Sequence, residues 1–86
     1  MEVEYKKKAL EDLAYWKEKG DLKIQNRISD LIKDICNNPF TGIGKPEPLK
    51  YELSGLWSRR ITRQHRIIYE VFNSKISIIS MKGHYK

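Results

Sequence analysis

The sequence predicts an α+β fold, in which two N-terminal helices pack on a small β-sheet formed by the second half of the chain. Apolar residues recur at three- and four-residue spacing in residues 6–36, as they do along one face of an amphipathic helix. Residues 56–82 instead hold short runs of β-branched and aromatic residues, separated by polar turns. Eighty-six residues provide for one hydrophobic core, so we expect a single domain over residues 1–86.

The helical half of the chain predicts two helices joined by a tight turn. The apolar stripes indicate a first helix over residues 6–19 and a second over residues 22–36. Gly20 can end the first helix in a left-handed conformation, and Asp21 can cap the second by accepting a backbone N–H bond. Pro39 disfavours helical geometry in the residue before it, which limits the second helix. We therefore expect an antiparallel helical hairpin.

The second half of the chain predicts three strands joined by hairpin turns. They cover residues 56–61, 66–72 and 75–82, and residues 2–5 could start a further strand. The helices must cover one face of such a sheet, which leaves the other face as the candidate working surface. Alternation along the middle strand assigns Ile67, Tyr69 and Val71 to one face, and Arg66, Ile68, Glu70 and Phe72 to the other.

A stiff loop, residues 39–50, connects the two halves. It contains all three prolines of the chain and two of its glycines. Pro46 and Pro48 each fix their own φ and bias the preceding residue toward extended geometry. Glu47 is therefore held between two prolines on a backbone that cannot easily become helical.

The net charge of +6 belongs entirely to the second half of the chain. Residues 1–44 carry eight basic and eight acidic side chains, whereas residues 45–86 carry nine basic and three acidic ones. Charge segregated in this way indicates a surface for a large anion, most commonly a nucleic acid. A solvated basic surface that only keeps the protein in solution is an equally valid interpretation of the charge alone.

Composition and cysteine usage argue against several classes of protein. No apolar run approaches the ~20 residues that a membrane span needs. The first residues, MEVEYKKK, contain no apolar segment of a secretory signal. Cys36 is the single cysteine, so no disulfide forms within the chain, and it is typical of a small buried apolar residue. We therefore expect a cytoplasmic protein without a membrane partner.

Five residues could carry out chemistry on a phosphodiester if the fold brings them together. Glu47 is a carboxylate on a stiff loop, and His84 is an imidazole just beyond the last strand. Such a pair can act as general base and general acid, each contributing about 10²–10⁴-fold in rate. Arg66, with Lys50 and Arg60 nearby, could stabilise the charge that develops on the phosphorane oxygens. These groups suffice for RNA cleavage without a metal ion.

Each of these residues also has a simpler interpretation. Taken singly, Glu47 and His84 are more often solvated surface residues than catalytic ones, and the same holds for Tyr85. Arg59 and Arg60 point in alternate directions along a strand, so one of them can be a solubilising charge only.

Three other residues have weaker claims to a functional role. His65 is expected to be exposed in a hairpin turn. Trp57 is more typical of core or loop packing than of a platform for stacking RNA bases. Two separated histidines and Cys36 do not make a zinc site, so we predict no metal and no cofactor.

Most of the chain resembles the YoeB (Txe) branch of the RelE-type toxins of bacterial toxin–antitoxin modules. The resemblance is carried by residues 38–71, NPFTGIGKPEPLKYELSGLWSRRITRQHRIIYEV, and by the terminal HY. Tyr15-Trp16 and the segment LIKD in the helices also fit. This resemblance implies a RelE-like fold, with two N-terminal helices on a small, twisted, mostly antiparallel sheet.

The resemblance also implies an activity and a set of roles. Members of the branch are ribosome-dependent endoribonucleases that cut mRNA in the decoding site. By resemblance, Glu47 is the general base, His84 the general acid, and Arg66 the residue that holds the scissile phosphate. Contacts to RNA or its phosphates are expected from Lys50, Arg60, Tyr85 and the neighbouring Arg59.

The partners implied by the resemblance are a cognate antitoxin of the YefM/Phd type, which folds on binding, and the ribosome with its mRNA. A homodimer is a further option. Two departures from the branch are that Gly83 precedes His84 where bulkier residues are common, and that Lys86 follows the usually terminal tyrosine.

Two other functions stay open at this level. The chain could be a non-catalytic protein of toxin fold that binds another partner, such as gyrase. It could also be a structural partner of the antitoxin whose basic face only binds an acidic peptide.

Overall fold

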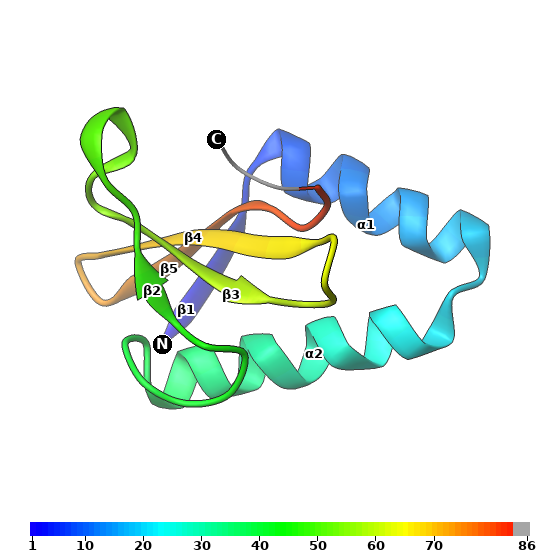
Figure 1. Cartoon of the computed structure of the whole chain (residues 1–86), viewed down its shortest axis with the longest axis horizontal. Coiled ribbons are helices and arrows are strands. Elements are labelled where there is room, and N and C mark those ends of the chain that lie inside the picture. The colour runs from blue at the N-terminus through cyan, green and yellow to red at the C-terminus, as the bar shows by residue number, and fades with distance from the viewer. Residues whose placement is uncertain (84–86) are drawn as a thin grey trace.

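Two helices and a five-stranded sheet build the protein, as the sequence predicts (Figure 1). The structure is a computed structural model that describes residues 1–83. None of the helices in this part of the chain is long and apolar enough to cross a membrane. The elements are β1 (Glu2–Tyr5), α1 (Lys7–Lys19), α2 (Leu22–Asn37), β2 (Glu47–Pro48), a 3₁₀ turn (Tyr51–Leu53), β3 (Leu56–Arg60), β4 (Arg66–Phe72) and β5 (Lys75–Ser80).

The sheet is mostly antiparallel, with the strand order β1-β5-β4-β3-β2. Strands β2 to β5 pair with their neighbours in antiparallel fashion, whereas β1 pairs in parallel with β5. The tentative first strand is thus real. The expectation of a loop throughout residues 39–50 is wrong in one respect, because Glu47 and Pro48 pair with Trp57 and Ser58 as strand β2. The extended geometry that the flanking prolines impose is compatible with this pairing.

The ends of the helices follow the sequence signals. Gly20 ends α1 at a φ of +69°, and its N–H donates to the carbonyl of Lys17 at 3.1 Å. The carboxylate of Asp21 then accepts a hydrogen bond from the Ile24 N–H at 3.0 Å, which caps α2. The turn between the helices is short, and Figure 1 shows them as a hairpin beside the sheet, with the β2–β3 connection at the opposite end of the molecule.

The core lies between the helical hairpin and one face of the sheet. Ile67 and Tyr69 of β4 are fully buried there, which confirms the face that alternation assigns to them. The fully or nearly fully buried members of this cluster are Ala9, Trp16, Ile28, Leu31, Ile35, Ile61, Ile67, Tyr69, Ile76, Ile78 and Met81. Arg66 begins β4 on the opposite face of the sheet, which the helices leave open.

Helix α1 fixes the backbone of Met81, the residue that follows β5. The Met81 N–H donates to the Asp12 carboxylate at 2.8 Å, and the Met81 carbonyl accepts from the Trp16 indole N–H at 2.9 Å. Asp12 and Trp16 lie four residues apart on the buried face of the helix. Lys8 adds an ion pair to the other carboxylate oxygen of Asp12 at 2.5 Å. The chain therefore leaves the sheet in a direction that α1 sets.

Replacing Asp12 by Ala should destabilise the protein by about 1–3 kcal/mol, because the buried Met81 N–H loses its acceptor. Glu11→Ala is the matched control, since Glu11 is exposed on the same helix and should change stability by less than about 0.5 kcal/mol. Urea denaturation of the two variants measures the difference. Equal stabilities would mean that the Met81 hydrogen bond contributes nothing.

Candidate active site on the open sheet face

Glu47 and Arg66 meet on the face of the sheet that the helices leave open. Arg66 Nη1 lies 3.5 Å from Glu47 Oε1, although the two residues are nineteen positions apart in the chain. The strand register explains the approach. Glu47 pairs with Ser58 across β2 and β3, and Arg60 pairs with Arg66 across β3 and β4. Residues paired in this way project from the same face, so all four side chains point to one side.

The two charges differ in how firmly they are held. The Arg66 side chain is 17% exposed, and its Nη1 also lies 3.5 Å from the hydroxyl oxygen of the fully buried Ser58. The Glu47 side chain is 51% exposed. An exposed ion pair of this length contributes little to stability, so an incoming anion can compete for the guanidinium at small cost. Ser58 is a part of this site that the sequence alone did not suggest.

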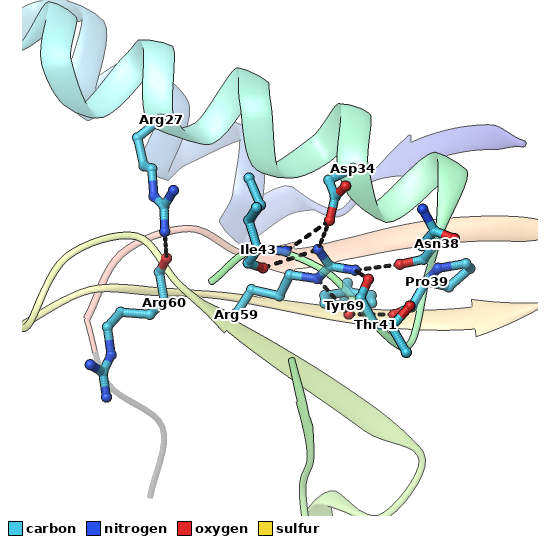
Figure 2. A network of polar contacts seen from close by, with 9 residues as sticks. All are labelled: Arg27, Asp34, Asn38, Pro39, Thr41, Ile43, Arg59, Arg60 and Tyr69. Carbon is cyan, nitrogen blue, oxygen red and sulfur yellow. Dashed lines mark hydrogen bonds and ion pairs between the residues drawn. The ribbon is translucent and has the colours of Figure 1, made fainter. Parts of the chain in front are cut away.

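Lys50 and Arg60 flank the pair. Lys50 is exposed at the start of the β2–β3 connection, where residues 47–53 line an open cleft of about 620 Å³. The Arg60 side chain points away from α2 in Figure 2. Its backbone is fixed on both sides, since its N–H donates to the Gly44 carbonyl at 2.7 Å and its carbonyl accepts from Arg27 Nη2 at 3.2 Å. By register, Lys50 follows the Leu49–Leu56 hydrogen bond at one end of β3, whereas Arg60 pairs with Arg66 at the other end, so the two cations lie on either side of Glu47.

Arg59 does not belong to this face, which corrects the expectation that it contacts RNA. Its side chain is fully buried between the sheet and the C-terminal end of α2, and Figure 2 shows the guanidinium surrounded by acceptors. The guanidinium pairs with the Asp34 carboxylate at 2.5 Å. It also donates to the carbonyls of Asn38, Thr41 (3.0 Å) and Ile43 (3.1 Å) and to the Tyr69 hydroxyl (3.2 Å). A phosphate cannot reach it without disrupting the fold.

The surroundings of this network shift the pKa values of two of its members, Asp34 and Tyr69. Hydrogen bonding from Arg59, reinforced by the Ile43 N–H, holds the pKa of Asp34 below its usual range. Burial raises the pKa of the Tyr69 phenol. The Tyr69 hydroxyl donates to the Pro39 carbonyl at 2.6 Å, so it also holds the start of the loop that leads to β2.

His65 is not an exposed turn residue, contrary to expectation. Its ring packs edge-on against Trp16, with 4.8 Å between the centroids, and its Nδ1 accepts a hydrogen bond from the Gly83 N–H at 2.8 Å. Trp57 packs against Phe40, with 4.9 Å between the ring centroids, as a packing residue would. His84 and Tyr85, the remaining predicted site residues, lie outside the described part of the chain.

The family model for the YoeB-like toxin of bacterial type II toxin–antitoxin systems matches residues 5–85. The chain belongs to this family. It is 45% identical to the toxin YoeB of Escherichia coli K12 over 85 residues, which cover 99% of this chain and all of the relative. It is 51% identical to the toxin YoeB of Synechocystis over 71 residues, 83% of each chain.

Solved structures give the same family and the same fold. A YoeB/ParE toxin from Agrobacterium tumefaciens superposes with a TM-score of 0.93 at 38% identity, over 99% of this chain and all of the other. The toxin of a heterotetrameric YoeB–YefM complex from Staphylococcus aureus superposes with a TM-score of 0.89 at 41% identity, over 99% and 98% of the two chains. The predicted YoeB (Txe) resemblance and RelE-like fold are therefore confirmed.

Replacing Arg59 by Met should destabilise the fold, whereas replacing Arg60 by Met should not. Several hydrogen bonds to a charged group, each worth about 1.5–3 kcal/mol, are lost together at Arg59, so we expect a loss of at least about 3 kcal/mol. The Arg60 side chain makes no comparable contacts among the described residues. Urea denaturation of both variants measures the contrast, and similar midpoints would contradict a structural role for Arg59.

The Asp34–Arg59 pair should make stability depend on pH in the acidic range. The pKa of Asp34 is lowered by folding, so its contribution is complete above the ordinary pKa of 3.8 and is lost as the pH falls below that value. The stability difference between wild type and Asp34→Asn should therefore shrink on acidification. Asp30→Asn, an exposed position on the same helix, is the control. A difference that stays constant from pH 7 to pH 2 would exclude this linkage.

Proposed function

We propose that this toxin is a ribosome-dependent, metal-independent endoribonuclease that cleaves mRNA in the A site and so inhibits translation. The observation that carries the proposal is the pairing of Glu47 with Arg66 on the open, basic face of the sheet. When a carboxylate and a guanidinium lie within 3.5 Å of each other, the carboxylate can contact the 2′-hydroxyl of a nucleotide while the guanidinium binds the adjacent phosphate. Family membership supports the same activity.

In the proposed reaction the RNA supplies its own nucleophile. Glu47 takes the proton of the 2′-hydroxyl as general base, and the 2′-oxygen attacks the adjacent phosphorus. The bond from phosphorus to the 5′-oxygen breaks, which leaves a 2′,3′-cyclic phosphate on one product. His84 donates a proton to the departing 5′-oxygen, so the other product ends in a 5′-hydroxyl. No metal or cofactor is needed for this proton balance.

The cations stabilise the charge of the transition state. Arg66 binds the scissile phosphate through its planar fork, and this binding exchanges its contact with Glu47 for contacts with the phosphate oxygens. Glu47 is thereby released at the moment when a base is required. Lys50 and Arg60 add contacts to the same backbone, and Tyr85 orients or stacks on the substrate.

The ribosome supplies the positioning that so small a protein lacks. Holding the reacting groups in line can contribute ~7–11 kcal/mol to a barrier. An open face with a half-exposed base offers few contacts to fix a flexible RNA strand. An mRNA already held in the decoding site arrives ordered, which is why we propose that cleavage requires the ribosome and occurs in the cytoplasm.

We also propose that a cognate antitoxin of the YefM type binds this toxin and silences it. The YoeB relatives from Staphylococcus aureus, about 40% identical, include complexes with YefM and a YoeB dimer. A basic face of the kind described here suits an acidic peptide that folds on binding. A homodimer belongs to the same proposal.

Replacing Glu47 by Gln should lower the rate of mRNA cleavage in programmed bacterial ribosomes by about 10²-fold or more, because the general base is lost. Primer extension maps the cut and measures its rate. Glu52→Gln is the control, since Glu52 is an exposed acid of the same connection and should leave the rate unchanged. In the same assay Arg66→Ala should also lower the rate, with the exposed Arg63→Ala as its control.

Three outcomes would contradict the proposal. Cleavage of free RNA at the ribosomal rate would exclude ribosome dependence. Full cleavage by a folded Glu47→Gln protein would remove Glu47 from the mechanism. Toxicity without any cleavage would favour the alternative function, a toxin-fold protein that binds another partner such as gyrase.

A further inference from the structure

Two consecutive residues hold both backbone polar groups of Gly83. The Gly83 N–H donates to His65 Nδ1 at 2.8 Å, and the Gly83 carbonyl accepts from the Arg66 N–H at 3.1 Å. Gly83 is the last residue before the terminal His84-Tyr85-Lys86. Gly83 is therefore fixed beside Arg66, the residue proposed to bind the scissile phosphate.

The hydrogen bond defines the tautomer of His65. A backbone N–H can only donate, so Nδ1 must be the unprotonated acceptor, and the imidazole in this contact is neutral with its proton on Nε2. The ring has little freedom to turn away. It packs edge-on against Trp16, and the His65 carbonyl accepts from the N–H groups of Ile61 (2.9 Å) and Thr62 (3.1 Å).

Gly83 needs such a restraint. Its φ is +83°, a conformation that other residues rarely adopt, and an added Cβ would meet no atom of the described residues within 4 Å. Glycine samples many conformations of this kind at similar cost. The hydrogen bond from the Gly83 N–H to His65 thus replaces the steric restraint that a bulkier residue would provide. Two residues earlier, Asp12 and Trp16 hold Met81 in the same manner.

We propose that His65 is a positioning residue of the active site, whose neutral ring holds Gly83, the residue that precedes the proposed general acid His84 in the chain. This inference rests on the proposed ribonuclease function. In the proposed reaction, His65 does not contact the reacting atoms. It acts through Gly83 on the residue that follows, and it thereby links the core residue Trp16 to the general acid.

Two variants separate the hydrogen bond from the packing. His65→Asn retains a carbonyl oxygen close to the position of Nδ1 but loses the ring, whereas His65→Phe retains a ring against Trp16 but loses the acceptor. Stability and function should therefore rank them in opposite order. The Phe variant should have the higher midpoint in urea, and the Asn variant should have the higher cleavage rate.

The first measurement is hydrogen exchange of the Gly83 amide by NMR, which needs no substrate. Exchange should be slow in wild type and in His65→Asn, and at least about tenfold faster in His65→Phe. Unchanged exchange in the Phe variant would overturn the inference whatever the activity. Should that variant not fold, His65→Leu fills the same space without an acceptor and is judged by the same criterion.

The second measurement is single-turnover cleavage on programmed ribosomes. His65→Phe should lower the rate at saturating toxin by about 10–100-fold, the loss that a small misplacement of a reacting group produces. The toxin concentration for half-maximal rate should stay unchanged, and His65→Asn should restore most of the rate. If His65→Phe combined fast Gly83 exchange with full cleavage, the hydrogen bond from Gly83 to His65 would not contribute to catalysis.

The two measurements distinguish failure of this inference from failure of the proposed function. A folded wild-type protein that does not cut mRNA overturns the ribonuclease, and with it a catalytic role for His65. Gly83 exchange would still decide whether His65 holds Gly83. Normal wild-type cleavage combined with equal rates in the Phe and Asn variants overturns the His65 role alone.

Discussion

A charged side chain, Arg59, connects more parts of this small protein than any apolar contact described above. Its guanidinium binds Asp34 of α2, the loop carbonyls of Asn38, Thr41 and Ile43, and Tyr69 of β4 (Figure 2). Burying an unpaired charge would cost several kcal/mol, so these acceptors are required for folding. In satisfying Arg59 they also fix the loop that carries the chain from α2 to Glu47. The candidate base Glu47 is therefore positioned in part by Arg59, whose side chain lies on the other face of the sheet.

Two neighbouring arginines in β3 point to opposite faces of the sheet because a strand alternates its side chains. Arg59 faces the helices and is fully buried, whereas Arg60 faces away from them and is partly exposed to solvent. The same alternation collects Glu47, Ser58 and Arg66 on the open face. The sheet thus separates the Arg59 network on one face from the candidate active site on the other.

The backbone that follows β5, at Met81 and Gly83, is also held by side chains from other elements. Met81 is fixed by α1 through Asp12 and Trp16, and Gly83 by His65 and Arg66. Each contact uses a backbone group beyond the last strand, where no ladder partner is available. Core packing and the proposed chemistry meet at Trp16, which contacts both Met81 and the ring of His65.

The sequence by itself determined the local elements and the faces of the sheet. Helix caps, prolines and two-residue alternation act over a few residues, so the roles of Gly20 and Asp21 and the shared face of Ile67 and Tyr69 followed from spacing alone. Tertiary structure decided which elements pair, because pairing depends on contacts between distant residues. It placed β1 parallel to β5, turned Glu47–Pro48 into a strand, buried Arg59 rather than Arg60, and packed His65 on Trp16. No local pattern distinguishes two adjacent arginines until a helix with Asp34 covers one of them.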